Sequence, residues 1–214
     1  KIYASGIQQA AEQTAAKVVV VSSSADSRYL TPLVAVGLSA GYATNVVGAP
    51  SSLAPFTVKR SVFTNKAFTQ SEITSDIKII GVSNNAFGSM ENNVSCTVEE
   101  FAANLATSSV TVASVDKATD KVTIADAEVV VSGGRGLKGP ENWHMIEDLA
   151  EVLGAATACS KPVSDMGWRP HSEHVGQTGK PVASNLYIAI GVSGAIQHLA
   201  GINSSKVKVV INSD

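Results

Sequence analysis

Short runs of apolar, β-branched residues recur along the chain and predict the strands of a sheet. The runs at 17–22, 78–83 and 128–132 are continuous, which is typical of parallel strands buried on both faces. Residues 56–63 alternate in part and instead predict an antiparallel strand. Shorter apolar runs predict three more strands, at 155–160, 186–192 and 206–212.

Segments with helical spacing or turn residues lie between these strands. Helices are predicted at 7–17 and 29–40, and two more are expected to open at Pro140 and at Ser193. The alternation of strand and helix indicates the α/β class with a parallel sheet. The remaining segments, 84–95 and 161–185, read as loops.

A polar stretch at 116–127 separates two periodic regions and predicts a domain boundary. We therefore expect two α/β domains, residues 1–120 and residues 121–214. The first reads as a partial Rossmann-like domain. The second carries clearer strand–turn–helix signals and reads as a parallel-sheet domain.

Charge and cysteine content exclude several classes of protein. Lys and Arg number 16 and Asp and Glu 18, a balance that argues against a nucleic-acid-binding surface and against a polybasic membrane segment. No apolar run approaches the roughly 18–20 residues that cross a bilayer, so a soluble chain is expected. Cys96 and Cys159 form no disulfide framework or zinc motif, and both are expected to be buried thiols of an intracellular protein.

The segment Gly134–Gly139 has the spacing G-x-G-x-x-G between a predicted strand and a predicted helix. Glycines in such a turn let backbone N–H groups approach a diphosphate at a helix N-terminus. A dinucleotide fold also needs an acidic residue at the end of the next strand, but that strand ends at Ser160-Lys161. The standard NAD interpretation therefore fails there, and a structural turn with a solvated Arg135 remains open.

Two further turns precede apolar segments. Gly176–Lys180 (GQTGK) is not an ATP-binding P-loop, because His174 stands where that motif needs glycine and Pro181 where it needs Ser or Thr. This turn still offers a hydroxyl and backbone amides. Ser193-Gly194 follows a predicted strand and opens a predicted helix, which makes it a second candidate anion site.

The histidines leave two interpretations open. His198 lies about one turn into the helix predicted from Ser193, either as a satisfied core residue or as a ligand contact. His171, Glu173 and His174 lie in a predicted loop, where nothing orients them as metal ligands, so no metal site is predicted. The chain lacks the G-x-S-x-G motif of many hydrolases, so covalent hydrolysis has no support.

Five segments together resemble the alpha subunit of electron-transfer flavoproteins. They are SGGRGLKG (132–139), ACSKPVSD (158–165), HVGQTGK (174–180), IAIGVSGAIQHLAG (188–201) and VVIN (209–212). The string GQTGK, followed by SGAIQHLAG at the family's spacing, is the most specific. The resemblance is strong over about 128–212 and looser over the first 120 residues, which resemble the latter part of the family's domain I. It implies a fragment, with a strand and helix before Lys1 and a further stretch carrying an acidic ribose ligand after Asp214.

The resemblance implies FAD in the second domain. Arg135 and Asn212 match positions around the adenosine end of FAD. Ser160, Ser193 and the amides near Gly194 match the diphosphate region. No catalytic residue and no metal ligand is implied.

Other matched residues belong to the flavin end. Gln177 and Thr178 match the loop near the ring, and His198 matches the residue facing its pyrimidine carbonyl. The family usually has arginine where Lys161 stands, and often glutamine where His174 stands. The expected cofactor-binding residues are Arg135, Ser160, Lys161, Val175, Gly176, Gln177, Thr178, Gly179, Ser193, Gly194, Ala195, Ile196, Gln197, His198 and Asn212.

The implied function is electron transport rather than catalysis on a substrate of its own. An alpha subunit of this family pairs with a beta subunit, accepts electrons from flavin dehydrogenases such as the acyl-CoA dehydrogenases of fatty acid β-oxidation, and passes them to a quinone oxidoreductase. The implied location is the bacterial cytoplasm, or the mitochondrial matrix in a eukaryote. Two alternatives remain open: a bifurcating flavoprotein that works with ferredoxin, and a nucleotide-binding scaffold without a redox role.

Overall fold

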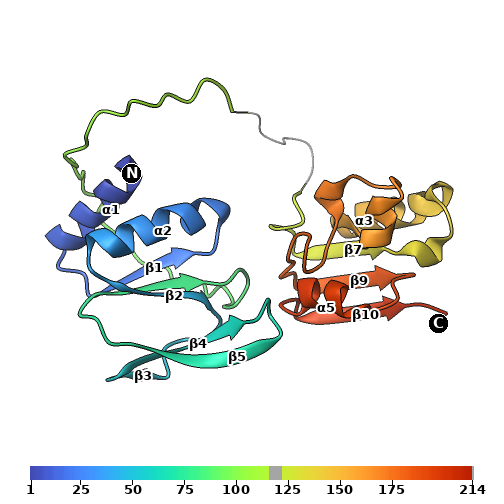
Figure 1. Cartoon of the computed structure of the whole chain (residues 1–214), viewed down its shortest axis with the longest axis horizontal. Coiled ribbons are helices and arrows are strands. Elements are labelled where there is room, and N and C mark those ends of the chain that lie inside the picture. The colour runs from blue at the N-terminus through green and yellow to red at the C-terminus, as the bar shows by residue number, and fades with distance from the viewer. Residues whose placement is uncertain (116–121, 214) are drawn as a thin grey trace. The chain divides into compact units, whose positions relative to one another are not determined.

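The computed structural model describes residues 1–115 and 122–213 (Figure 1). The chain divides into two compact units, Lys1–Val62 with Phe68–Asp116, and Phe63–Ala67 with Lys117–Asp214. The boundary expected between residues 120 and 121 lies outside the described residues. Both units combine helices with a sheet, so the expected α/β class with two domains is confirmed.

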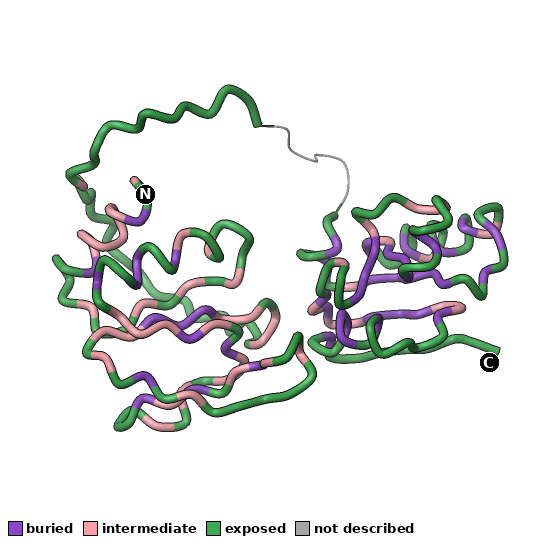
Figure 2. Tube along the Cα trace, in the orientation of Figure 1, coloured by how far each residue is buried: buried purple, intermediate pink, exposed green. Residues whose placement is uncertain are grey.

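A mixed six-stranded sheet forms the first unit, in the order β1-β6-β2-β4-β3 with β5 paired to β4. Figure 1 shows α1 and α2 on one face of this sheet. After β6 the chain runs through 84–115 without helix or strand, and most of these residues are exposed (Figure 2). The elements are α1 (Ile2–Gln13), β1 (Val18–Ser22), α2 (Ala25–Gly37), β2 (Gly41–Val46), β3 (Ser52–Leu53), β4 (Phe56–Val62), β5 (Ala67–Ile73) and β6 (Lys78–Val82).

Three expectations for the first unit are wrong. β1 is an edge strand and is not buried on both faces; its side chains alternate, and Val20 is exposed. Both helices begin earlier than predicted, and α2 starts at Ala25 because the Ser24 hydroxyl accepts a hydrogen bond from the Ser27 N–H. Cys96 is exposed because it lies in the 84–115 segment, whereas Cys159 is buried as expected.

The second unit is built on a four-stranded parallel sheet in the order β10-β9-β7-β8. Its elements are β7 (Val129–Gly133), the 3₁₀ helices η1 (Arg135–Leu137) and η2 (Pro140–Trp143), α3 (His144–Leu153), β8 (Ala156–Cys159), α4 (Lys161–Asp165), the 3₁₀ helix η3 (His171–Glu173), β9 (Leu186–Ile190), α5 (Ile196–Ile202) and β10 (Val207–Ile211).

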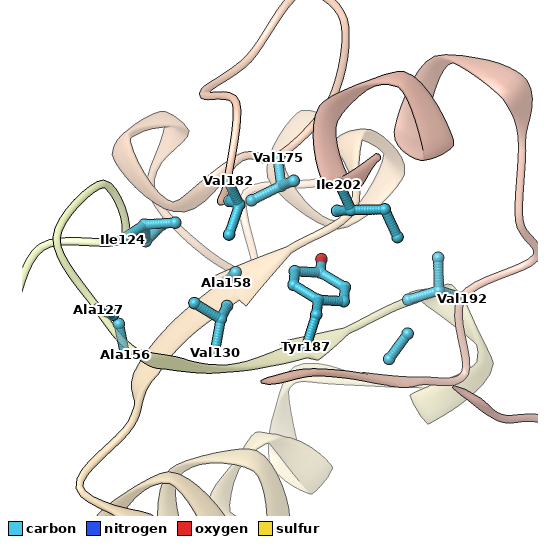
Figure 3. Close-up of a cluster of buried hydrophobic side chains, with 11 residues drawn as sticks. Ile124, Ala127, Val130, Ala156, Ala158, Val175, Val182, Tyr187, Val192 and Ile202 are labelled. Atoms are coloured by element: carbon cyan, nitrogen blue, oxygen red, sulfur yellow. The ribbon is translucent and has the colours of Figure 1, made fainter. Parts of the chain in front are cut away.

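Separate cores cover the two faces of this sheet. On one face, α3 and α4 pack against the strands through a cluster that includes Trp143, Ile146 and Val163. On the other face, Val175, Val182 and Ile202 close over side chains of the sheet, Tyr187 among them (Figure 3). Strands β7 and β9 lie at the centre and are buried as predicted, whereas the edge strand β10 is exposed throughout.

Helix starts in the second unit differ from those predicted. Pro140 begins a 3₁₀ helix, and the α-helix follows only at His144. The helix expected from Ser193 starts at Ile196. The segment 161–185, expected to be a loop, contains α4 and η3. Ser160 is the N-cap of α4 and Pro162 lies in its first turn. The helix ends before Met166, and its five residues are too few to show helical spacing in the sequence.

Arg169 fixes the segment that follows α4 against α3. Its guanidinium makes two hydrogen bonds to the Glu173 carboxylate, at 2.8 and 2.7 Å, and one to Glu147 Oε1 at 2.9 Å. It also lies over the Trp143 ring, 5.4 Å from the centroid. A forked guanidinium suits this arrangement, because it pairs with a carboxylate and stacks on a ring together. The chain therefore enters the 174–180 segment from a fixed position.

The glycines of the 134–139 motif pack turn against turn. The Gly134 and Gly136 N–H groups donate to the carbonyls of Ile190 and Gly191, at 2.8 and 2.9 Å. A Cβ on Gly134 would lie 2.0 Å from the Gly191 oxygen. Of the two interpretations left open for this motif, the structural turn therefore holds for Gly134 and Gly136, because both amides already bond to the turn after β9.

We predict that Gly134→Ala lowers the stability of the second unit by roughly 1–3 kcal/mol, because the new methyl meets backbone that cannot rotate away. Urea unfolding followed by tryptophan fluorescence measures this unit, since Trp143 and Trp168 both lie in it. The matched control is Gly154→Ala, where the Cβ meets open space and only the positive φ of +60° opposes it. Equal losses from the two substitutions would contradict the packing argument.

Candidate functional site

The carboxyl edge of the second sheet is where its turns converge. Gly133 pairs with both Cys159 and Ile190, and Ile190 pairs with Ile211, so the four strands end side by side. The chain passes from β7 to β8 on one side and then crosses to β9 on the other side of β7. Open parallel sheets bind ligands at such a reversal of strand order.

A cavity of about 630 Å³ opens at this edge, within the size range of cofactor sites. All of the expected cofactor-binding residues line it except Gly179, Gly194 and Ile196. Its lining consists of Arg135, Gly136, Lys138, Ser160, Lys161, Pro162, Asp165, His174, Val175, Gly176, Gln177, Thr178, Gly191, Val192, Ser193, Ala195, Gln197, His198, Asn212 and Ser213.

The charge of the lining favours an anion. Arg135 and Lys138 come from the turn after β7, and Lys161 is the first residue of α4. Asp165 is the one carboxylate among the lining residues. Three fixed cations against one carboxylate give the cavity a positive potential.

The turn after β9 supplies backbone donors. Gly191 and Gly194 both have positive φ, +65° and +71°, which bends the chain sharply between β9 and α5. The N–H groups of Ser193, Gly194 and Ala195 donate to no acceptor in the described parts of the chain. Successive free N–H groups in such a turn form an anion-binding concavity.

The turn that carries Gln177 and Thr178 is held on α5. The Gln177 N–H donates to the Gln197 carbonyl at 2.7 Å. A Cβ on Gly201 would lie 2.6 Å from Gly176 Cα, so the two backbones are in direct contact. Gln177 and Thr178 therefore line the cavity at a position fixed by the same helix that carries His198.

His198 is buried in the wall of the cavity. Its Nε2 lies 2.9 Å from the Tyr187 hydroxyl, and its Nδ1 is buried without a hydrogen-bond partner among the described residues. Burial lowers the pKa of His198 to about 4; nearby His174 adds to this effect and the Val175 backbone opposes it. The ring is therefore neutral at pH 7, and its Nδ1 makes no hydrogen bond within the described residues.

His174 also lines the cavity and is buried. Burial lowers the pKa of His174, with Lys161 and His171 acting in the same direction and Asp165 against it. His171 faces Ser164, with Nδ1 2.7 Å from the hydroxyl. The described residues contain no group of three His, Cys, Asp or Glu side chains that could hold a metal ion.

Several lining residues were not among those expected, including the charged residues Lys138 and Asp165, and Tyr187 was not expected behind the lining. Lys138 lies inside the glycine motif and Asp165 inside the ACSKPVSD segment. Their positions in these motifs could therefore have indicated that both line the cavity. Tyr187 contacts His198 from within β9. Its place in an apolar strand run gave no sign that it contacts a polar residue.

We predict that the second unit loses stability as pH falls from about 6.5 to 4. The folded state depresses the His198 pKa from 6.5 to about 4, so the unfolded chain binds the proton more readily across this window. The contribution of His198 is full above pH 6.5 and falls by up to about 3 kcal/mol at pH 4. The measurement is urea unfolding against pH.

His198→Gln removes the titrating group and should flatten this pH dependence, leaving the smaller contribution of His174 in the same direction. His144→Gln, at an exposed histidine of the same unit, is the matched control and should leave the profile unchanged. A profile that His198→Gln does not alter would show that His198 is not held neutral by burial.

Comparisons with known proteins cover both units. The family described as "Electron transfer flavoprotein domain" matches residues 1–127, and "Electron transfer flavoprotein FAD-binding domain" matches residues 123–203. The second match identifies FAD as the cofactor of this domain, in agreement with the sequence-based expectation. None of the helices in the described residues has the length and apolarity needed to cross a membrane.

Curated relatives agree with the family matches. A Caenorhabditis elegans protein, "Probable electron transfer flavoprotein subunit alpha, mitochondrial", is 39% identical over 198 residues, covering 92% of this chain and 59% of the relative. The alpha subunit of Pseudomonas aeruginosa is 36% identical over 198 residues, covering 92% and 63%. That of Syntrophomonas wolfei is 56% identical over 91 residues, covering 42% and 29%.

The chain thus spans at most 63% of the length of these relatives. The matches nevertheless extend along both units, and the higher identity falls in the shorter alignments. The chain belongs to the electron transfer flavoprotein family, as an alpha subunit.

Proposed function

We propose that the cavity at the carboxyl edge of the second sheet holds FAD and that the chain carries electrons through it. The observation that carries this proposal is the cavity itself: its lining holds three cations, Ser193 and Ala195 from a turn whose N–H groups have no acceptor among the described residues, and His198, whose buried Nδ1 has no partner there either. Each of these groups needs a polar or anionic partner. A flavin dinucleotide supplies such partners at both of its ends.

The donor set fits the parts of FAD. The N–H groups of Ser193–Ala195 and the cation of Lys161 suit a diphosphate, which is the most concentrated charge in the molecule. Arg135 and Asn212 are assigned to the adenosine end, and Gln177 with Thr178 to the ring. Asn212 is held in place for this role, because its Nδ2 donates to the Val192 carbonyl at 3.3 Å.

Bound FAD would supply the capacity to accept and release electrons, and the protein would supply position and electrostatics. His198 would act as a neutral donor inside the buried wall and would favour a bound group that carries negative charge. Lys161 keeps a positive charge at the position where the family usually has arginine, without the planar fork of that residue. Residues 174–178 line the cavity, and the backbone of this segment lies against α5.

We further propose that the chain works with a beta subunit, receives electrons from flavin dehydrogenases such as acyl-CoA dehydrogenases, and delivers them to a quinone oxidoreductase. Support comes from the alpha-subunit relatives, which include a mitochondrial and several bacterial proteins. We propose the bacterial cytoplasm as its location, or the mitochondrial matrix in a eukaryotic source.

The test is a visible spectrum of the chain with FAD, alone and with a beta subunit, followed by reduction and reoxidation. A flavin spectrum that bleaches with dithionite and returns in air supports the carrier. Bound FAD that cannot be reduced and reoxidised would instead support a nucleotide-binding scaffold. No saturable binding under either condition would overturn the proposal.

We predict that Lys161→Gln weakens FAD binding roughly tenfold, equal to about 1.4 kcal/mol, by removing a cation from the cavity. The loss should be larger at low salt, because screening reduces the charge interaction in the wild type. Fluorescence titration of FAD at two salt concentrations measures both effects. Lys206→Gln, at an exposed lysine outside the cavity, is the matched control; equal effects would show a general charge effect instead.

We predict that His198→Ala lowers the midpoint potential of bound FAD by tens of millivolts. The lost donor is worth about 1.4 kcal/mol in the reduced state, or ~59 mV for one electron. Affinity for oxidised FAD should change much less. Redox titration of the FAD-loaded protein with its beta subunit measures the potential. An unchanged potential together with loss of oxidised FAD would make His198 a binding residue only.

A further inference from the structure

Tyr187 stands behind His198 in the core of the second unit. Its side chain is fully buried on β9, and its hydroxyl lies 2.9 Å from His198 Nε2. Figure 3 shows the Tyr187 ring rising from the sheet, with its oxygen directed toward the elements that cover this face. Tyr187 does not line the cavity, whereas His198 does. The tyrosine therefore acts on the cavity only through the histidine.

The hydrogen-bond needs of this pair select one tautomer. A neutral imidazole has one N–H and one bare nitrogen. Burial raises the pKa of Tyr187, so its phenol keeps the proton and can donate it. If Nε2 accepts that hydrogen, the imidazole proton sits on Nδ1, the buried nitrogen with no partner among the described residues.

The Nε2–H tautomer of His198 would leave more polar groups without a hydrogen-bond partner. If Nε2 carried the proton and donated it to the tyrosine oxygen, the phenolic hydrogen would need another acceptor. Ser132 is the neighbouring polar side chain; it lowers the Tyr187 pKa against the larger effect of burial, but its hydroxyl has no hydrogen-bond partner among the described residues. The Nε2–H tautomer thus leaves both the phenolic hydrogen and the bare Nδ1 unpaired among the described residues, whereas the Nδ1–H tautomer leaves only the Nδ1 hydrogen unpaired.

We propose that Tyr187 is a positioning residue that fixes His198 as the Nδ1–H tautomer, so that the cavity receives a hydrogen-bond donor. This inference rests on the proposed FAD site, because it specifies which atom of His198 the bound group meets. It adds a requirement on a residue outside the cavity: the chemistry of the site depends on a phenol that the ligand does not touch. Second partners of this kind commonly set histidine tautomers at metal and catalytic sites.

The first test needs no ligand. Nitrogen NMR of the ¹⁵N-histidine-labelled full chain distinguishes a protonated ring nitrogen from a bare one, and assignment comes from loss of signals in His198→Gln. The expected result at pH 7 is a protonated Nδ1 and a bare, hydrogen-bonded Nε2. A protonated Nε2 in the wild type would overturn the inference, whatever any variant shows.

The second test uses Tyr187→Phe, which keeps the ring in the core and removes only the hydroxyl. The Nδ1–H population of His198 should fall, because Nε2 loses its donor. Ser184→Ala is the matched control, since it removes a buried hydroxyl of the same unit, one that bonds to Ser205. That variant should keep the wild-type tautomer, and a shift as large as that of Tyr187→Phe would overturn the inference.

The third test connects the tautomer to the cofactor. In the FAD-loaded protein, Tyr187→Phe should lower the ratio of reduced to oxidised FAD affinity about tenfold, which is ~30 mV for a two-electron couple. Combined with His198→Ala it should add no further shift, because the tyrosine acts through the histidine. A purely structural role would change stability and both affinities alike, without moving the potential, and would overturn the inference.

The two proposals fail separately. If FAD does not bind, the proposed function is wrong, while the tautomer measured in the ligand-free chain still decides the role of Tyr187. If FAD binds and the ligand-free chain shows protonated Nε2, the proposed function stands and the Tyr187 inference falls.

Discussion

Backbone contact between the turns after β7 and β9 is the constraint on which the site depends. Gly134 and Gly136 lie directly against Gly191, with no room for a side chain on any of the three. The contact uses the N–H groups of Gly134 and Gly136, whereas those of Ser193–Ala195 have no acceptor in the described parts of the chain. In the proposed site, the donors for an anion therefore belong to the turn after β9, and the turn after β7 supports that turn. A sheet with side chains at these positions would separate the turns and open the end of its own core.

A second backbone contact between glycines positions another part of the cavity lining. Gly176 meets Gly201 backbone to backbone, so the turn with Gln177 and Thr178 lies directly on α5. α5 is itself held by the core cluster through Ile202 and by the bond between His198 and Tyr187. The wall of the cavity is thus set by the packing of the sheet, although none of the lining residues belongs to a strand.

The sequence predicted the central strands and the turns that line the cavity. It predicted less well where the helices start and which partners individual groups bond to, such as the Gly134 N–H and the Tyr187 hydroxyl. Buried runs such as 128–132 mark central strands because both of their faces are covered, but the same pattern at β1 misled, since strand order is a tertiary property. Motif spacing located the turns at the strand ends. It could not tell whether Gly134 serves a ligand or another turn, because both uses require a missing side chain. The contact between Tyr187 and His198 could not be predicted, because an aromatic residue within an apolar run looks like any other core residue. The sequence pattern gives no information about the hydrogen bond of its hydroxyl.

The charges of the cavity divide into two kinds with different effects. Arg135, Lys138 and Lys161 carry permanent charge, which attracts an anion in whatever redox state it arrives. His198 is kept neutral by burial, so it interacts with a bound group through one hydrogen and adds no charge of its own. A dipole fixed in a low-dielectric wall stabilises charge that appears beside it more than it stabilises a neutral partner. For the proposed FAD site we therefore infer that affinity depends mainly on the cations, while discrimination between two states of the ligand depends on the buried histidine and on the tyrosine bonded to it.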